Sequence, residues 1–251
     1  MLPWGYWVST HNIVAALKQH RRMCKIRIWG IPNSLMNEFA AMKEPFPELT
    51  NLRLQSGDRN VPVLPDSFLG GSAPRLRILD FCGIPFPAVG KLLLSPQNLN
   101  TLHLRSIPHS GYISPEAVVT CLSALTGLEL FFLGFRYPQS GVGGVTRHVP
   151  PLTRIVLPVL TKFAFKGNSE YLEDITSLID TPLLDYFEIT FFNQLIFDTP
   201  RLHDFISCTE KIKAHYRANV RFNQGHCMVS YAIANGSTRI WGYWLTPTRS
   251  L

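Results

Sequence analysis

The sequence predicts an α/β protein with the architecture of a leucine-rich-repeat solenoid. In this horseshoe, short parallel strands form a concave sheet, and helices and irregular segments cover the convex side. Two observations predict it. Three apolar anchors at i, i+3 and i+5 recur seven times, starting at residues 23, 49, 76, 99, 128, 160 and 184. The steps between copies run from 23 residues (76 to 99) to 32 (128 to 160), and leucine-rich repeats span ~20–29 residues.

The anchor pattern is clearest in Leu76-x-x-Leu79-x-Phe81 and Leu99-x-x-Leu102-x-Leu104. The alternation of apolar, polar and apolar residues at the end of each copy is typical of a short half-buried strand. One such strand cannot bury its apolar side alone, so we expect each copy to lie beside the next. A doubly wound α/β sheet is the alternative, but its strands are near-continuous apolar runs, which this pattern does not provide.

Helices are expected between several of the strands. They should begin near Thr10, Leu35, Ser114, Ser169 and Thr199. The clearest start is Ser114-Pro115-Glu116, because a capping serine precedes a proline at the first helical position and an acid in the first turn. A Gly- and Pro-rich loop over Gly134–Pro151 accounts for the longest step. A weaker eighth strand is expected near Ile212–Phe222.

The C-terminal end differs from the repeats, which we assign to residues 1–225. In residues 226–251, two apolar stretches, Met228–Ala234 and Thr238–Leu245, flank Asn235-Gly236. Asn-Gly between such stretches is the strongest short signal for a hairpin. Because a solenoid needs an atypical end over its last layer, we expect a capping hairpin, or else a tail outside the fold.

The composition is that of a folded domain with acidic partners. The chain has 251 residues, of which 46% are hydrophobic and 16% charged, so extensive disorder is not expected. Its net charge is +7 and its pI about 9.3, which favours an acidic partner. The charge is too mild and too scattered to indicate nucleic acid.

The cysteines predict an intracellular protein, cytoplasmic or nuclear. All five are far apart in the sequence and form no C-x-x-C motif, a distribution that fits reduced thiols better than a disulfide framework. No apolar run approaches the ~20 residues of a membrane helix. Met1–Thr10 has no basic segment followed by a long apolar one, so we expect neither a secretory signal nor a membrane partner.

No motif predicts catalysis, a cofactor or a metal. Gly141-Val142-Gly143-Gly144 lacks the Lys-Ser/Thr that a phosphate-binding loop requires. The eight histidines show no metal-ligand spacing with the cysteines, and Ser110-Gly111 is not a nucleophile elbow. We therefore expect a binding protein and not an enzyme.

The residues that alternate with the anchors predict the binding surface, since they should point out of the concave face. Lys and Arg occupy these positions six times, and Asp and Glu twice. Aromatic residues interrupt this basic strip, as in a protein-binding hot spot. A protein or an acidic peptide is the expected partner, and a phosphorylated segment is a further alternative. The predicted partner-binding residues are Lys25, Arg27, Trp29, Arg53, Asp80, His103, Arg105, Phe132, Lys162, Lys166, Tyr186 and Glu188.

Several longer segments resemble a large family of fungal, basidiomycete-type proteins that combine an F-box with leucine-rich repeats. They are Phe46–Thr50, Leu64–Leu76, Gly83–Pro87, Ile107–Glu116 and Phe197–Pro200. The likeness covers roughly residues 10–225. It implies a substrate-recognition subunit of a ubiquitin ligase, in which the F-box docks on an adaptor subunit and the repeats hold the substrate.

An F-box should precede the repeats, and three short helices with their loops need roughly 40 residues. Nothing before Met23 has that room, so we expect the repeat region without its F-box. Adaptor docking is then expected only if an F-box lies outside this chain. The alternative is a free-standing scaffold or inhibitor-like binder of an acidic protein, with no link to a ligase.

Overall fold

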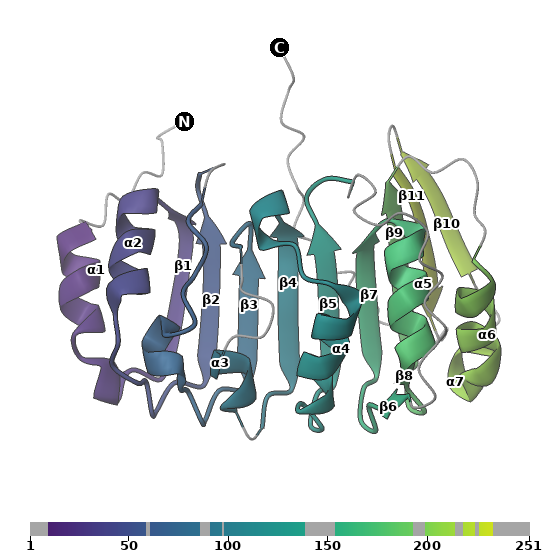
Figure 1. Ribbon diagram of the computed structural model, residues 1–251, viewed down its shortest axis with the longest axis horizontal. Helices are drawn as coiled ribbons and strands as arrows, with labels where there is room; N and C mark the ends of the chain where they lie inside the picture. Colours follow the sequence, from purple (N-terminus) through teal and green to yellow (C-terminus); the bar gives the residue numbers. More distant parts are fainter. Residues whose placement is uncertain are drawn as a thin grey trace, which may run out of the picture.

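The computed structural model describes residues 10–58, 61–85, 91–96, 98–138, 154–192, 199–213, 218–223 and 226–232. Its main sheet has nine strands in the order β1-β2-β3-β4-β5-β7-β9-β11-β10. The first seven of these are mutually parallel, and each pairs with the next of the seven in chain order (Figure 1). They are β1 (Lys25–Ile31), β2 (Asn51–Ser56), β3 (Ile78–Cys82), β4 (Thr101–Ile107), β5 (Leu130–Phe135), β7 (Lys162–Gly167) and β9 (Tyr186–Phe192). The chain is thus a mixed α/β protein with a seven-stranded parallel sheet.

All seven predicted strands are present, and their middle anchors pair in one continuous ladder. The ladder runs through Ile26, Leu52, Leu79, Leu102, Phe131, Phe163 and Phe187. Each of these side chains is at most 3% exposed. The register is well determined, because a slip of one residue would turn the whole ladder to the opposite face of the sheet.

The helices lie on one face of this sheet (Figure 1). The α-helices are α1 (Thr10–Leu17), α2 (Asn33–Ala41), α3 (Lys91–Leu94), α4 (Pro115–Ser123), α5 (Ser169–Leu178), α6 (Pro200–Cys208) and α7 (Glu210–Lys213). Three 3-10 helices are η1 (His20–Arg22), η2 (Phe68–Gly71) and η3 (His109–Gly111). The predicted start of α4 is confirmed, since Ser114 Oγ accepts the Ala117 N–H at 3.3 Å. We call the opposite face, which carries none of the described helices, the open face.

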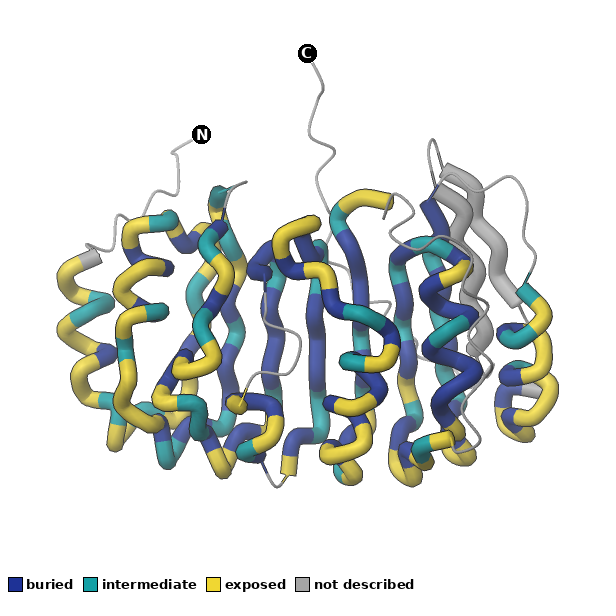
Figure 2. The backbone as a smooth tube through the Cα atoms, viewed as in Figure 1, coloured by how far each residue is buried: buried dark blue, intermediate teal, exposed yellow. Residues whose placement is uncertain are grey.

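The hydrophobic core fills the space between the sheet and the helices. Its buried side chains form one cluster that extends from Leu17 in α1 to Ile212 in α7. Figure 2 shows buried residues along the strands and exposed residues on the outer turns of the helices. A small parallel sheet of β6 (Ile155–Val156) and β8 (Ile179–Asp180) was not predicted, because strands of two residues carry no periodic signal. No helix in the described part of the chain is long and apolar enough to cross a bilayer.

The C-terminal end of the sheet is a hairpin of β10 (Ala218–Asn223) and β11 (His226–Ala232). β11 lies between β9 and β10 and is antiparallel to both. The eighth strand expected near Ile212–Phe222 is present in part as β10, but it is antiparallel to its neighbour, and Ile212 and Lys213 belong to helix α7. A hairpin was expected, but around Asn235-Gly236.

The hairpin differs from the prediction because β11 pairs with the strand before it. Met228–Ala234, the first predicted hairpin strand, overlaps β11. Its predicted partner, Thr238–Leu245, lies outside the described residues. Both edges of β11 are already occupied by β9 and β10, so it has no free edge for a further strand. The turn signal at Asn235-Gly236 could not indicate this, because it carries no information about which edges are taken.

The cysteine side chains differ in reactivity in a way that tests the fold. Cys24, Cys82, Cys121 and Cys208 are free thiols. Cys121 is 4% exposed in α4, and burial raises the pKa of its thiol to about 12, whereas Cys24 is exposed. At pH 8 we expect iodoacetamide to alkylate Cys24 readily and Cys121 only in denaturant, because the thiolate is the nucleophile. Peptide mass spectrometry measures both, and equal rates in the native protein would contradict this packing.

Candidate functional site

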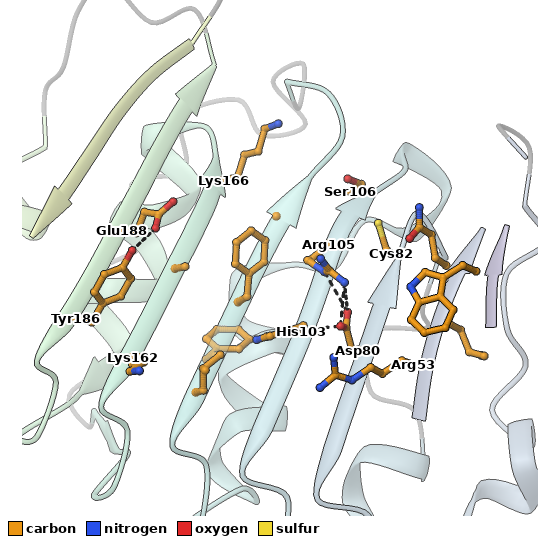
Figure 3. Close-up of a pocket in the computed structure, with 18 residues that line it drawn as sticks. Arg53, Asp80, Cys82, His103, Arg105, Ser106, Lys162, Lys166, Tyr186 and Glu188 are labelled. Carbon is orange, nitrogen blue, oxygen red and sulfur yellow. Dashed lines mark hydrogen bonds and ion pairs between the residues drawn. The ribbon is translucent and has the colours of Figure 1, made fainter. Parts of the chain in front are cut away.

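The open face carries a pocket of about 330 Å³ that extends from β1 to β9 (Figure 3). Ten of the twelve predicted partner-binding residues line it. They are Trp29, Arg53, Asp80, His103, Arg105, Phe132, Lys162, Lys166, Tyr186 and Glu188. Lys25 and Arg27 do not line it, although both are exposed. They lie on the edge strand β1, where Trp29 marks the end of the pocket.

The parallel register explains why residues so distant in sequence meet here. Arg53 pairs in register with Asp80, and Asp80 with His103 on the next strand. On the other side of the pocket, Lys162 pairs with Tyr186. Because alternate residues of a strand share a face, each strand contributes two or three side chains to one row.

Asp80 is the centre of a buried ion-pair cluster. Its side chain is 6% exposed, and Arg105 donates to it through Nε at 3.0 Å and through Nη2 at 2.7 and 2.9 Å. His103 Nδ1 lies 3.7 Å from the second carboxylate oxygen. Burial alone would raise the pKa of Asp80, but the His103 imidazole and the Arg105 charge outweigh it, so this pKa is lowered. Asp80 is therefore a carboxylate at neutral pH, and Arg105 is engaged within the protein.

Three other cations of the pocket have no described carboxylate within ion-pair distance: Arg53, Lys162 and Lys166. The Nε of Arg53 is buried and has no hydrogen-bond partner among the described residues. Lys166 Nζ lies 5.4 Å from the centre of the Phe192 ring, and burial lowers its pKa. Arg53 and Lys166 gain from an anionic ligand, because buried charges and donors are stable only when paired, and the exposed Lys162 adds positive charge beside them.

Tyr186 and Glu188 form a polar wall on β9. The Tyr186 hydroxyl donates a hydrogen bond to a Glu188 carboxylate oxygen. Burial, and then this bond and the charge of Glu188, raise the pKa of Tyr186. The tyrosine therefore stays neutral. Four Arg and Lys side chains face two carboxylates in the pocket, so its lining is positive even with a neutral histidine.

Ala164 is a short side chain in the row that lines the pocket. It pairs in register with Phe132 on one side and with Glu188 on the other, and is half-buried. A Cβ at Gly134 would lie 2.7 Å from Cε1 of the Phe132 ring, so this ring lies over Gly134 and needs a glycine there. We call the space above Ala164, between Phe132 and Glu188, the hollow.

Several lining residues were not among the predicted site residues. They are Leu54, Gln55, Cys82, Ser106, Leu130, Phe131, Gly134 and Ala164. Gly134 and Ala164 occupy outward positions of the repeat, but small side chains carry no charge or aromatic signal. Ser106 lies one residue beyond those positions, where its φ of 51° coincides with a change of register in β4. That irregularity could not be predicted from a pattern with a period of two.

Among the described residues, no group of three or more His, Cys, Asp or Glu side chains could hold a metal. Burial is the main reason that the pKa of the Cys82 thiol is raised, so it is not an activated nucleophile. Gly141-Val142-Gly143-Gly144 lies outside the described residues. The arrangement is suited to binding an anionic ligand with an apolar part.

Comparison with known proteins adds no family to this description. No family model, no curated protein and no solved structure matches the chain. The site is therefore defined by its own geometry: an open-face pocket with an excess of cations around a hollow beside an aromatic ring.

Proposed function

We propose that this chain is a leucine-rich-repeat solenoid that binds an acidic protein segment on its open face. One observation carries the proposal: Arg53, Lys162 and Lys166 line one pocket without a described carboxylate partner. Trp29, 61% exposed at one end, and Phe132 near the centre supply apolar contact area. Aromatic and arginine side chains are enriched among the residues that dominate protein interfaces. The proposed activity is binding, with no catalysis, cofactor or metal.

Two features support the solenoid. The recurrence of 23 to 32 residues gives one parallel strand per copy, and the strands follow in chain order. The β10–β11 hairpin ends the parallel series, as a cap would. The solenoid would then span residues 1–225, with 226–251 as its C-terminal cap and tail.

The link to a ubiquitin ligase rests on the resemblance to the fungal F-box family. Two of the segments that carry it, Phe46–Thr50 and Leu64–Leu76, contribute Phe46, Leu49 and Phe68 to the core behind the sheet. These segments therefore support the likeness of the scaffold, because their residues pack in the core and not in the pocket. A substrate-recognition role in a ligase predicts capture of the adaptor subunit by a chain that includes an F-box. A free-standing binder predicts a partner that is not degraded.

The exposed free thiols of Cys24 and Cys208 support an intracellular location, cytoplasmic or nuclear. Nucleic acid is the less favoured ligand, because Asp80 and Glu188 face the same pocket as the cations.

Peptide-display selection on the immobilised chain tests the binding proposal. We expect enrichment of Asp and Glu in the selected peptides, and we expect Arg53→Glu/Lys166→Glu to abolish it. The control Lys18→Glu/Lys211→Glu makes the same change of net charge at exposed positions outside the pocket, and should retain the enrichment. Enrichment that is absent, or equal in both variants, would remove the open face as the site.

A further inference from the structure

We infer that the pocket recognises a spacing within that partner. The pattern is a large apolar side chain with one acid within two residues and a second acid four to six residues away, in a segment extended across the strands. This inference rests on the proposed function and specifies the chemistry of the bound segment.

The hollow is the place for the apolar side chain. Its base is Ala164 and one wall is the Phe132 ring, which His103 meets edge-on at 6.1 Å between centroids. The strand neighbours of Ala164 are larger, so a ligand side chain there is enclosed on two sides. Enclosure beside an aromatic ring favours a leucine-sized group over a glycine or a polar residue.

The position of the near acid in the peptide follows from the two lysines of β7. Lys162 and Lys166 each lie two residues from Ala164 on the same strand, about 7 Å from it at the usual rise per residue. Because the segment crosses the strands, one lysine lies on each side of its path at Ala164. An acid one or two residues from the apolar side chain is still within reach of one of them, because a lysine side chain is long and flexible.

The position of the far acid in the peptide follows from the distance between Ala164 and Arg53 across the sheet. Arg53 is on β2, four strands from β7 in the order β2-β3-β4-β5-β7. Strands lie about 4.8 Å apart, so the backbones at Arg53 and Ala164 are about 19 Å apart. An extended segment covers that span in about six residues, or about four when the long side chains reach toward each other. The strands between contribute Arg105, whose guanidinium is already held by Asp80 (Figure 3).

A peptide fits this layout better than a nucleic acid. The carboxylates of Asp80 and Glu188 lie between and beside the cations, so a continuous row of phosphates would meet like charges. Two separate acids with neutral residues between them avoid both carboxylates.

The test measures fluorescence anisotropy with labelled synthetic peptides in low salt. The probe carries leucine, an aspartate two residues before it and an aspartate five residues after it, with Gly/Ser spacers. Three comparison probes have the same net charge. The first has its far aspartate only two residues after leucine, the second has glycine in place of leucine, and the third has a scrambled sequence. We expect each of the three to bind about tenfold more weakly than the original probe.

Two substitutions assign the contacts. Ala164→Leu fills the hollow, so the leucine and glycine probes should bind it alike, whereas the exposed-site control Ala15→Leu should still distinguish them. In the Arg53→Gln variant, removing the far aspartate from the probe should not weaken its affinity any further, as expected if these two groups contact each other. Circular dichroism confirms that each variant is folded.

The outcomes separate this inference from the proposed function. If the acidic probes bind alike whatever their spacing, and Ala164→Leu changes nothing, the spacing inference is overturned while acidic-peptide binding stands. If no acidic probe binds better than the same peptide with lysine in place of each aspartate, both the spacing inference and the proposed function are contradicted. A single-stranded oligonucleotide that binds more tightly than every probe would also overturn the inference.

Discussion

Replacing Phe163 with alanine should lower the free energy of unfolding by about 3–5 kcal/mol, the usual cost of deleting a buried aromatic side chain. Phe163 is fully buried, and its ring stacks between those of Phe131 and Phe187 at 5.3 Å from each. Phe163→Ala would leave a cavity between the Phe131 and Phe187 rings. β7 pairs with β5 on one side and with β9 on the other, so the loss acts on both sides of the gap.

Urea unfolding followed by circular dichroism measures this loss. The control is Tyr137→Ala, which removes an aromatic ring that is 50% exposed and stacked on His109. We expect this control to cost about 1 kcal/mol or less. A loss below about 1 kcal/mol for Phe163→Ala would show that the anchors are not packed as one ladder.

The second large effect concerns Asp80. Asp80→Ala would leave the Arg105 guanidinium and the His103 ring without their shared carboxylate. Loss of one partner of a fully buried pair costs ~3–5 kcal/mol, and we expect about 2–3 kcal/mol here because solvent screens the partly exposed arginine. The side chain of Arg105 is 30% exposed. Asp204→Ala, which removes an exposed carboxylate near His203, should cost about 0.5 kcal/mol or less.

The contribution of Asp80 should depend on pH in one direction. The pKa of this carboxyl is lowered from its ordinary value of 3.8 in the folded protein. The stabilisation is therefore fully present above the unfolded-state pKa and is lost as pH falls through the lower, folded-state pKa. The difference in unfolding free energy between the wild-type chain and Asp80→Ala should therefore shrink as the pH falls below about 4. A difference that stayed at its neutral-pH size well below about pH 4 would contradict the assignment of Asp80 as a carboxylate.

The ladder could be predicted because each copy of the sequence pattern contains three apolar anchors. Leu76, Leu79 and Phe81 are all fully buried, and every copy except the first, where Met23 and Ile28 are partly buried, also buries its three anchors. An error at one position would therefore be corrected by the rest. The burial of the outward residues could not be predicted in the same way. Asp80 and His103 occupy positions that a period of two assigns to the open face, and yet both are buried. Their burial depends on long neighbours such as Arg105, which is a matter of packing across strands.

The candidate site shows the same division. Charge and aromatic side chains marked ten of the residues that line the pocket, because these types stand out at outward strand positions. The hollow itself was not predicted, since it results from the short side chain of Ala164, which carries no charge or aromatic signal. Lys25 and Arg27 were included on charge alone, and the pocket ends before them.

The most direct test of acidic-segment binding is a charge swap. The affinities of one acidic peptide and of its counterpart with lysine at every acid are measured by anisotropy for the wild-type chain and for Arg53→Glu/Lys162→Glu/Lys166→Glu. The open-face pocket predicts that the wild-type chain prefers the acidic peptide and that the variant prefers the basic one. A variant that kept the wild-type preference, while circular dichroism showed it folded, would contradict the account.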